Sequence, residues 1–239
     1  MNAPRPARRA VAFAPVPDGW SARPPARAPL AGRHVRLEPL DPAAHGDALF
    51  AAGQAPGADA TWDYMGAGPF AARGPFDAFL ATYPPLDDPL MLAVVDRATG
   101  QAAGMAAFMD IRPAQGGIEI GHIWLSPALQ RTRAATEALF LMMAHAMEDL
   151  GYLRLQWKCN ALNAPSRRAA LRLGFRYEGT LHAHMLVKGR VRDTAFFSIL
   201  AEEWPDIAAR IRAWLDDANF DAAGRQIQAL SRLMDAPAG

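Results

Sequence analysis

The 239-residue sequence predicts a mixed α/β (α+β) fold, in which helices flank a mostly antiparallel sheet. Several short stretches alternate apolar and polar residues, which is typical of strands, and turn residues join consecutive strands directly, which favours antiparallel pairing. Over residues 132–150, apolar residues instead recur every three or four positions, which is typical of a helix. Because this helix follows one strand and precedes another, we expect a single crossover connection in the sheet.

The first predicted elements are a strand and a helix. Residues 34–40 alternate with period two and predict the strand. Asp41 suits a helix N-cap and Pro42 suits the first helical position, so we expect a helix from there to about residue 52. Residues 53–74, rich in Gly, Ala and Pro, predict an irregular segment. Its aromatic residues give it something to bury: Trp62, Tyr64 and Phe70.

The middle of the chain predicts two helices and three strands. Residues 76–83 have the pattern of a short amphipathic helix. Residues 90–97 and 101–110 flank a turn and predict an antiparallel hairpin. A further strand is expected over residues 118–125, and the long helix over residues 132–150 follows it.

The last third of the chain continues the mixed pattern. Residues 153–160 alternate and predict a strand, and residues 165–173 predict a short helix. A final hairpin is expected over residues 175–200. The tail over residues 203–235 has a helical pattern with a break near residues 219–224. Its apolar stripe could form a dimer interface or cover the protein's own sheet: Ile207, Ile211, Leu215, Ile227 and Leu230.

Composition indicates a globular protein of a reducing compartment. The hydrophobic fraction of 51% and the charged fraction of 21% are ordinary for such proteins. No apolar run approaches the roughly 18–20 residues that cross a bilayer, and the N-terminus lacks a signal-peptide pattern. Cys159 is the lone cysteine, and Cys and His do not fall at zinc-ligand spacing. We therefore expect a cytoplasmic protein that has neither a membrane span nor a metal ion.

Charge is distributed unevenly along the chain. Residues 1–33 carry a net charge of +5, with Asp18 as their one acid, whereas the whole chain carries +1. This segment is also dense in Pro and Ala, which predicts an extended, poorly folded arm. A basic arm could touch nucleic acid or ribosomal RNA. We favour a solvated tail partly pinned by Phe13 and Trp20, and we expect no nucleic-acid partner.

The junction before the long helix predicts a phosphate site. Residues 129–136 lie between an apolar run that ends at Pro127 and the helix. A strand that turns into a helix leaves backbone N–H groups without partners where the helix dipole favours negative charge. That combination can bind phosphate, and Arg131 and Arg133 add two cationic side chains. The alternative is two exposed arginines on the first turn of an ordinary helix.

Five motifs then stand in the order known from one family: residues 119–127, 130–135, 163–166, 173–175 and 188–193. With them, the chain resembles the GCN5-related N-acetyltransferase (GNAT) family. Within that family it is most similar to the Rim-type branch, which acetylates the N-termini of ribosomal proteins. The resemblance extends over roughly residues 33 to 204. It implies the GNAT fold with splayed central strands, acetyl-coenzyme A as co-substrate and acetyl transfer to a primary amine.

The resemblance also implies a coenzyme A site. The family's pyrophosphate loop maps to Gln130, Arg131, Thr132, Arg133, Ala134 and Ala135. Arg133 replaces the family's usual Gly, but it can still offer its backbone N–H and add a charge-assisted bond. Backbone N–H groups at Trp124 and Leu125 would polarise the thioester carbonyl. Asn163 would bond the pantetheine and Ser166 would lie near the sulfur, although both residue types also suit a helix N-cap.

An amine acceptor must lose a proton before it attacks, since its pKa is near 8 for an α-amino group and about 10.4 for lysine. Glu119 and His122 are the candidate bases, and Glu119 is favoured because it matches the family's carboxylate. One extra residue relative to the family motif predicts a bulge that aims a group at the site. Either residue could instead have a structural role, such as pairing with an Arg of a neighbouring strand. Ala170 stands where many members carry a Tyr acid, which leaves Ser166 or water to protonate the thiolate.

The last hairpin closes the acceptor groove in this branch. His184 and Asp193 are the candidate acceptor-binding residues, although Asp193 could equally pair with Arg190 or Arg192 near the turn. The acceptor could be a protein N-terminus or a small-molecule amine. Two other classes stay open: a non-catalytic coenzyme A-binding or regulatory module, and a nucleic-acid-associated or ribosome-associated protein that uses the basic arm.

The sequence thus predicts three parts. Residues 1–33 form a basic arm rich in Pro, Arg and Ala, residues 34–204 form the GNAT acetyltransferase domain, and residues 205–239 form a C-terminal helical extension. A homodimer through the extension is one possibility.

Overall fold

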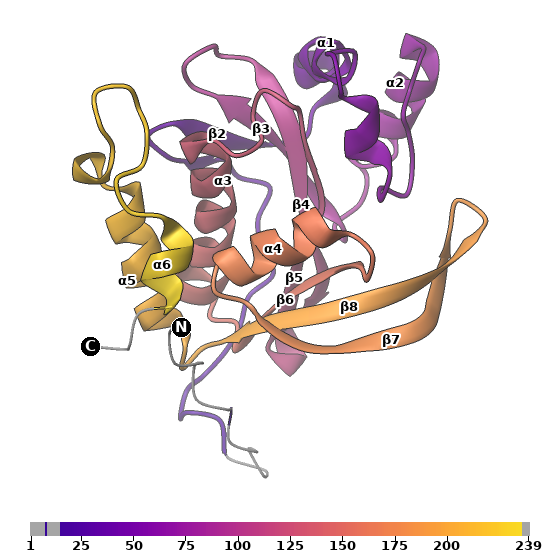
Figure 1. The fold of residues 1–239 in the computed structure, drawn as a ribbon. Helices are drawn as coiled ribbons and strands as arrows, with labels where there is room; N and C mark the ends of the chain where they lie inside the picture. Colours follow the sequence, from indigo (N-terminus) through magenta and orange to yellow (C-terminus); the bar gives the residue numbers. More distant parts are fainter. Residues whose placement is uncertain (1–7, 9–14, 236–239) are drawn as a thin grey trace.

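The computed structural model describes Arg8 and residues 15–235. Within these residues the chain forms one eight-stranded sheet with the order β1-β2-β3-β4-β5-β6-β8-β7 (Figure 1). The strands are β1 Leu30–Ala31, β2 Val35–Pro39, β3 Leu90–Asp96, β4 Ala102–Arg112, β5 Gly117–Leu125, β6 Arg154–Asn160, β7 Arg176–Val187 and β8 Arg190–Leu200. Neighbouring strands pair antiparallel except β5 and β6, which are parallel. The predicted fold class is confirmed.

Helices cover both faces of the sheet. The α-helices are α1 Pro42–Gly53, α2 Arg73–Ala81, α3 Arg133–Ala144, α4 Ala164–Arg172, α5 Trp204–Leu215 and α6 Leu230–Asp235. The short helical turns are η1 Asp59–Trp62, η2 Pro113–Gln115, η3 His145–Asp149 and η4 Asp217–Asn219. Helices α1 and α2 lie together and α1 packs on β4, whereas α3 packs on β2, β5 and α5 (Figure 1).

Strands β5 and β6 separate partway along their length. Their pairing begins at Gly117 opposite Arg154 and ends at Glu119 opposite Gln156. Beyond Glu119, β5 continues to Leu125 beside β4 alone, and β6 pairs with β8 on its other side. The predicted splay of the two central strands is therefore present, and it leaves backbone groups of β5 facing the gap.

Strand alternation gives the sheet two distinct apolar faces. Ile118 and Ile120 of β5 belong to the large core that contains α3, α4 and α5. Met105 and Trp124 belong to a second core with Trp62, beneath α1 and α2. Glu119 lies between Ile118 and Ile120 in β5, so its side chain is on the face of the second core. We call this side of the sheet the acceptor face.

Local capping follows the sequence closely. Asp41 accepts the backbone N–H of Ala43 at the start of α1, with Pro42 at the first helical position. The predicted helix over 132–150 divides into α3 and the π-helical turn η3, and Gly151, with φ of +76°, ends it. Tyr64 remains exposed, unlike the expectation for this aromatic residue, whereas Trp62 is buried.

The C-terminal segment covers the chain's own core. Ile207 and Ile211 of α5 are buried, as is Leu230 of α6. The break between these helices runs from residue 216 to 229, which is longer than expected, and it leaves Ile227 71% exposed. Most of the predicted apolar stripe therefore lies inside the protein.

The described part of the N-terminal arm lies against the body. The indole N–H of Trp20 donates to the carbonyl of Gly151 at 2.8 Å. Arg8 forms ion pairs with Glu203 at 2.6 Å and Glu178 at 2.8 Å. The predicted pinning by Trp20 is thus observed, whereas Phe13 lies outside the described residues.

Candidate active site

The start of α3 offers backbone donors at the open end of the β5–β6 gap. Thr132 is the N-cap, and its Oγ1 accepts the N–H of Ala135 at 3.1 Å. The N–H groups of Arg133 and Ala134, at the first two helical positions, have no acceptor within the helix. These groups, together with the positive end of the helix dipole, fit a diphosphate. The amide of Gln130 donates to the carbonyl of Leu125 at 3.0 Å and ties this loop to the end of β5.

The two arginines of this junction differ in what they can do. Arg131 is exposed and has a left-handed backbone conformation with φ of +63°. The guanidinium of Arg133 instead turns to the C-terminal segment, where it pairs with Asp217 at 2.7 Å and lies 4.1 Å from the centre of the Phe220 ring. The expected side-chain bond from Arg133 to a phosphate is therefore not set up in this structure, although its backbone N–H is in place.

The predicted bulge is present in β5. The register shifts between Ala107 opposite Gly121 and Met105 opposite Trp124, and His122 in between has φ of +49°. His122 Nδ1 lies 3.3 Å from the hydroxyl of Tyr83, which belongs to the core beneath α1 and α2. The bulge thus brings His122 to the acceptor face. Although His122 is exposed, desolvation by the surrounding protein lowers its pKa and favours the neutral ring.

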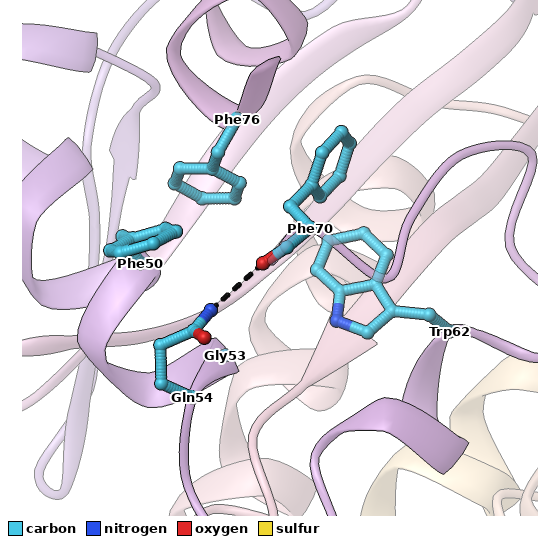
Figure 2. Close-up of a pocket in the computed structure, with 6 residues that line it drawn as sticks. All are labelled: Phe50, Gly53, Gln54, Trp62, Phe70 and Phe76. Atoms are coloured by element: carbon cyan, nitrogen blue, oxygen red, sulfur yellow. Dashed lines mark hydrogen bonds between the residues drawn. The ribbon is translucent and has the colours of Figure 1, made fainter. Parts of the chain in front are cut away.

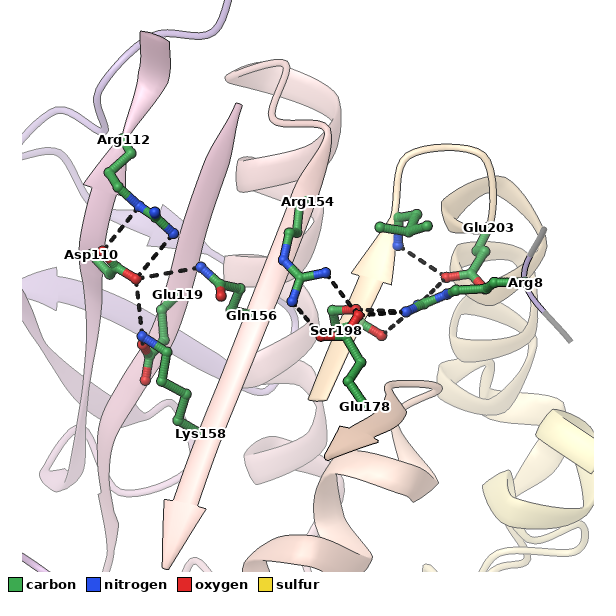
Figure 3. A network of polar contacts seen from close by, with 11 residues as sticks. Arg8, Asp110, Arg112, Glu119, Arg154, Gln156, Lys158, Glu178, Ser198 and Glu203 are labelled. Carbon is green, nitrogen blue, oxygen red and sulfur yellow. Dashed lines mark hydrogen bonds and ion pairs between the residues drawn. The ribbon is translucent and has the colours of Figure 1, made fainter. Parts of the chain in front are cut away.

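Glu119 is the buried carboxylate of the acceptor face. It is 3% exposed, and Nζ of Lys158 lies 2.7 Å from its Oε2 (Figure 3). Lys158 also pairs with Asp110 at 2.9 Å, so its ammonium group bridges two carboxylates. Burial raises the pKa of Glu119, and the positive charge of Lys158 opposes that rise. Glu119 therefore combines the raised proton affinity of a base with a partner that stabilises its ionised form.

The side chain of Trp124 belongs to an aromatic cluster and not to the gap. Its ring stacks on Trp62 with centroids 4.9 Å apart, and its indole N–H donates to Thr61 Oγ1 at 2.8 Å. Next to this cluster, Figure 2 shows a small pocket between α1, α2 and η1. It is lined by Phe50, Gly53, Gln54, Trp62, Phe70 and Phe76. The side chain of Leu125 packs against the large core. Any contact of Trp124 or Leu125 with coenzyme A would therefore use their backbone.

Asn163 and Ser166 stand at the start of α4, which follows β6 and packs on β6 and β7. Asn163 Oδ1 caps the helix by accepting the N–H of Ser166 at 3.0 Å, which leaves the Asn163 amide N–H₂ group for a ligand. Ser166 Oγ accepts the indole N–H of Trp157 at 3.0 Å and adjoins the thiol of Cys159. Cys159 is buried, and burial raises the pKa of its thiol, as expected for a core residue.

The two candidate acceptor residues of the hairpin have structural partners. Asp193 accepts the backbone N–H of Ala183 at 2.8 Å and pairs with His182 at 2.9 Å, where β7 bulges and Ala183 has φ of +49°. Those bonds, first the one from Ala183, lower the pKa of Asp193. His184 Nδ1 lies 3.0 Å from Thr194 Oγ1. Asp193 therefore pairs with neither Arg190 nor Arg192.

The structure also supplies residues that the sequence did not single out. Lys158 contacts Glu119 and Tyr83 contacts His122, while Asp110 pairs with Lys158. These three residues come from β6, the segment after α2 and β4, respectively. Lys158 reads in the sequence as an ordinary polar position of an alternating strand. Gln156 pairs with Glu119, and Lys158 is two residues further along β6 on the same face. Lys158 could therefore be assigned to Glu119 once the strand register is known.

These groups can accept a proton and hold a diphosphate. The described residues contain no cluster of three or more His, Cys, Asp or Glu side chains suited to a metal ion. None of the helices in the described part of the chain is long and apolar enough to cross a membrane.

Comparisons with known proteins agree on one family. Residues 34–176 match the acetyltransferase (GNAT) domain family. A GCN5-related N-acetyltransferase from Brucella melitensis is 46% identical over 91% of this chain and 99% of that chain, with a TM-score of 0.89. A probable acetyltransferase (GNAT family) from Chromobacterium violaceum is 41% identical over 83% and 100%, with a TM-score of 0.75. "Putative ribosomal N-acetyltransferase YdaF" from Bacillus subtilis is 27% identical over 105 residues, which span 44% of this chain and 57% of that protein.

Proposed function

Because the chain belongs to the GNAT acetyltransferase family, whose acyltransferases use acetyl-coenzyme A as co-substrate, we propose that it transfers the acetyl group to a primary amine. The observation that carries this proposal is the buried Glu119 beside the point where β5 and β6 separate. The splay, the free N–H groups of α3 and the amide of Asn163 fit a pantetheine arm with its diphosphate. Acetyl-coenzyme A supplies the thioester carbonyl that the amine attacks.

Glu119 is proposed as the base. An α-amino group is mostly ammonium near neutral pH and has to give up one proton. The carboxylate of Glu119 accepts it, directly or through a water molecule, because burial raises its proton affinity toward that of the amine. His122 lies on the same face, and its lowered pKa favours a neutral ring that can also accept a proton.

Ser166 or water is proposed to protonate the departing thiolate. Ser166 Oγ accepts a hydrogen bond from Trp157, so its hydroxyl hydrogen would have to turn from the Cys159 thiol to the departing sulfur. Backbone N–H groups of Trp124 and Leu125 would polarise the thioester carbonyl as it gains negative charge.

For the acceptor, we propose either a protein N-terminus, as in the Rim-type branch, or a small-molecule amine. The likeness to YdaF supports that branch over 44% of the chain. A cytoplasmic location is part of the same proposal, supported by the single cysteine. The basic arm does not favour nucleic acid, because Arg8, Arg27 and Arg33 pair with the chain's own carboxylates.

The test compares Glu119→Gln with the unmodified protein. We expect turnover at neutral pH to fall by about 100-fold or more, within the range typical of a lost general base, while the Kd for coenzyme A changes less than about threefold. Turnover is measured as thiol release from acetyl-coenzyme A with a panel of amines, and binding is measured by calorimetry.

Two results would count against the proposal. Equal losses in turnover and binding would give Glu119 a structural role. Tight binding of coenzyme A by the unmodified protein, without turnover of any amine in the panel, would favour the non-catalytic module.

A further inference from the structure

Arg192 stands out on the acceptor face because it is half-buried and lacks an anionic partner. The other basic side chains of this face in β4 and β6 each pair with a carboxylate. Arg112 pairs with Asp110 at 3.0 Å, Lys158 with Glu119 at 2.7 Å, and Arg154 with Glu178 at 2.5 Å (Figure 3). Among the described residues, the side chain of Arg192 has no hydrogen bond or ion pair; the residue is half-buried and its Nε is buried.

The position of Arg192 points to the acceptor. In β8, Ala195 and Phe197 belong to the large core with α3, so alternation puts Arg192 on the opposite face. The pairing of β6 with β8 ends at Asn160 opposite Thr194. Arg192 lies two residues before Thr194, in the part of β8 that has no β6 neighbour. Arg192 is also close enough to Glu119 for the charge of each to shift the pKa of the other.

A half-buried guanidinium without an anionic partner is expected to bind an anion. Removing a guanidinium from water without a carboxylate or phosphate partner is unfavourable, and arginine cannot relieve this by losing its proton. Burial accordingly lowers the pKa of Arg192. Glu119 forms no ion pair with Arg192, and its carboxylate pairs with Lys158 instead.

We infer that Arg192 binds a carboxylate carried by the acceptor amine, so that the enzyme prefers acidic acceptors. This inference rests on the proposed function, because the proposed function places the acceptor amine beside Glu119. The carboxylate could belong to an acidic side chain near a peptide N-terminus or to a free amino acid. A planar guanidinium suits both sources, because it binds a carboxylate through two parallel hydrogen bonds.

The experiment compares Arg192→Gln with Arg190→Gln, a matched control on the same strand whose side chain is exposed. Two acceptor pairs separate the sources: tetrapeptides that begin Ser-Asp or Ser-Asn, and alanine with alaninamide. We expect the unmodified protein to prefer the carboxylate member of one pair by about tenfold or more in kcat/KM, the size typical of one charge-assisted hydrogen bond. Arg192→Gln should remove that preference and leave the neutral member and the KM for acetyl-coenzyme A within about twofold. Arg190→Gln should keep the preference.

A binding measurement keeps the inference separate from the proposed function. In protein saturated with coenzyme A, the carboxylate member should raise the melting temperature more than its neutral partner does, and Arg192→Gln should abolish the difference. Without ligand, Arg192→Met should melt at the same temperature as the unmodified protein or higher, because it removes a half-buried charge that has no anionic partner.

The inference is overturned if neither pair shows a carboxylate preference, if Arg192→Gln retains it, or if the loss appears only in the KM for acetyl-coenzyme A. Absence of turnover with every acceptor would instead refute the proposed function. In that case the melting measurement alone decides on Arg192.

Discussion

Lys158 influences the pH range in which Glu119 is ionised. Glu119 is buried, which raises its pKa, while the ammonium group of Lys158 at 2.7 Å lowers it. A base accepts a proton only when it is ionised, and Glu119 is ionised above its pKa. The acidic limb of the pH–rate profile should therefore lie above the range of an ordinary carboxylate.

Replacing Lys158 by Met should move that limb further. Loss of the positive charge removes the influence that lowers the pKa of Glu119, so the acidic limb of log kcat/KM should shift to higher pH, by about one unit or more. Lys158→Arg keeps the charge and should leave the limb near its original position. A limb that does not move in Lys158→Met would mean that another group is the base.

The position of single residues could be predicted from the sequence, but most of their contacts could not. The position of Glu119 on a strand could be predicted because its motif is local. Lys158 and Asp110 could not be assigned to it, since the contacts depend on the register of β6 against β5 and on the left-handed conformation of Asp110, φ +49°. Arg133 was expected to face a phosphate, but its side chain pairs with Asp217, a residue 84 positions away.

Among the elements, the start of α3 connects local sequence to ligand binding. Thr132 satisfies the N–H of Ala135, and its own hydroxyl donates to the carbonyl of Leu129 at 2.7 Å. These bonds fix the turn that presents the free N–H groups of Arg133 and Ala134. The cap could be predicted from sequence, because Thr is among the residues that favour this position.

Replacing Thr132 by Ala tests the cap. We expect a loss of about 1 kcal/mol in the free energy of unfolding, measured with denaturant, because the first turn of α3 loses its side-chain acceptor. Thr132→Ser keeps the hydroxyl and should recover most of the loss. Equal destabilisation by both substitutions would assign the effect to the methyl group of Thr132.

The bulge in β5 marks the limit of prediction for elements. An extra residue in the motif indicated that a bulge exists, but not which residue takes the left-handed conformation. In the structure it is His122, and the bulge turns this side chain toward Tyr83. Two residues three positions apart thereby reach the same face of the sheet, which regular alternation would forbid.

For the molecule as a whole, the C-terminal segment is proposed to be integral to the fold. Helix α5 buries Ile207 and Ile211 against the core that contains α3, and Arg133 ties the start of α3 to the segment after α5. The apolar stripe could be recognised in the sequence. Its destination, this chain or a second copy, could not, because both would bury the same residues.

A matched pair of substitutions tests this arrangement. Ile211 is fully buried and Ile227 is 71% exposed. Ile211→Ala should lower the free energy of unfolding by about 2–5 kcal/mol, the range for deleting a large core side chain. Ile227→Ala should change it by less than about 0.5 kcal/mol. A similar effect of both substitutions would contradict the packing of α5 on the core.

The most direct test of the whole account is a calorimetric titration of the folded protein with coenzyme A. If the N–H groups of α3 hold the diphosphate and the β5–β6 gap admits the pantetheine, uptake should saturate at one coenzyme A per chain. 4′-Phosphopantetheine, which lacks the adenosine half and its share of the diphosphate, should bind at least about tenfold more weakly, as expected for the loss of one or more charge-assisted hydrogen bonds. No detectable uptake of coenzyme A at millimolar concentration would contradict the account.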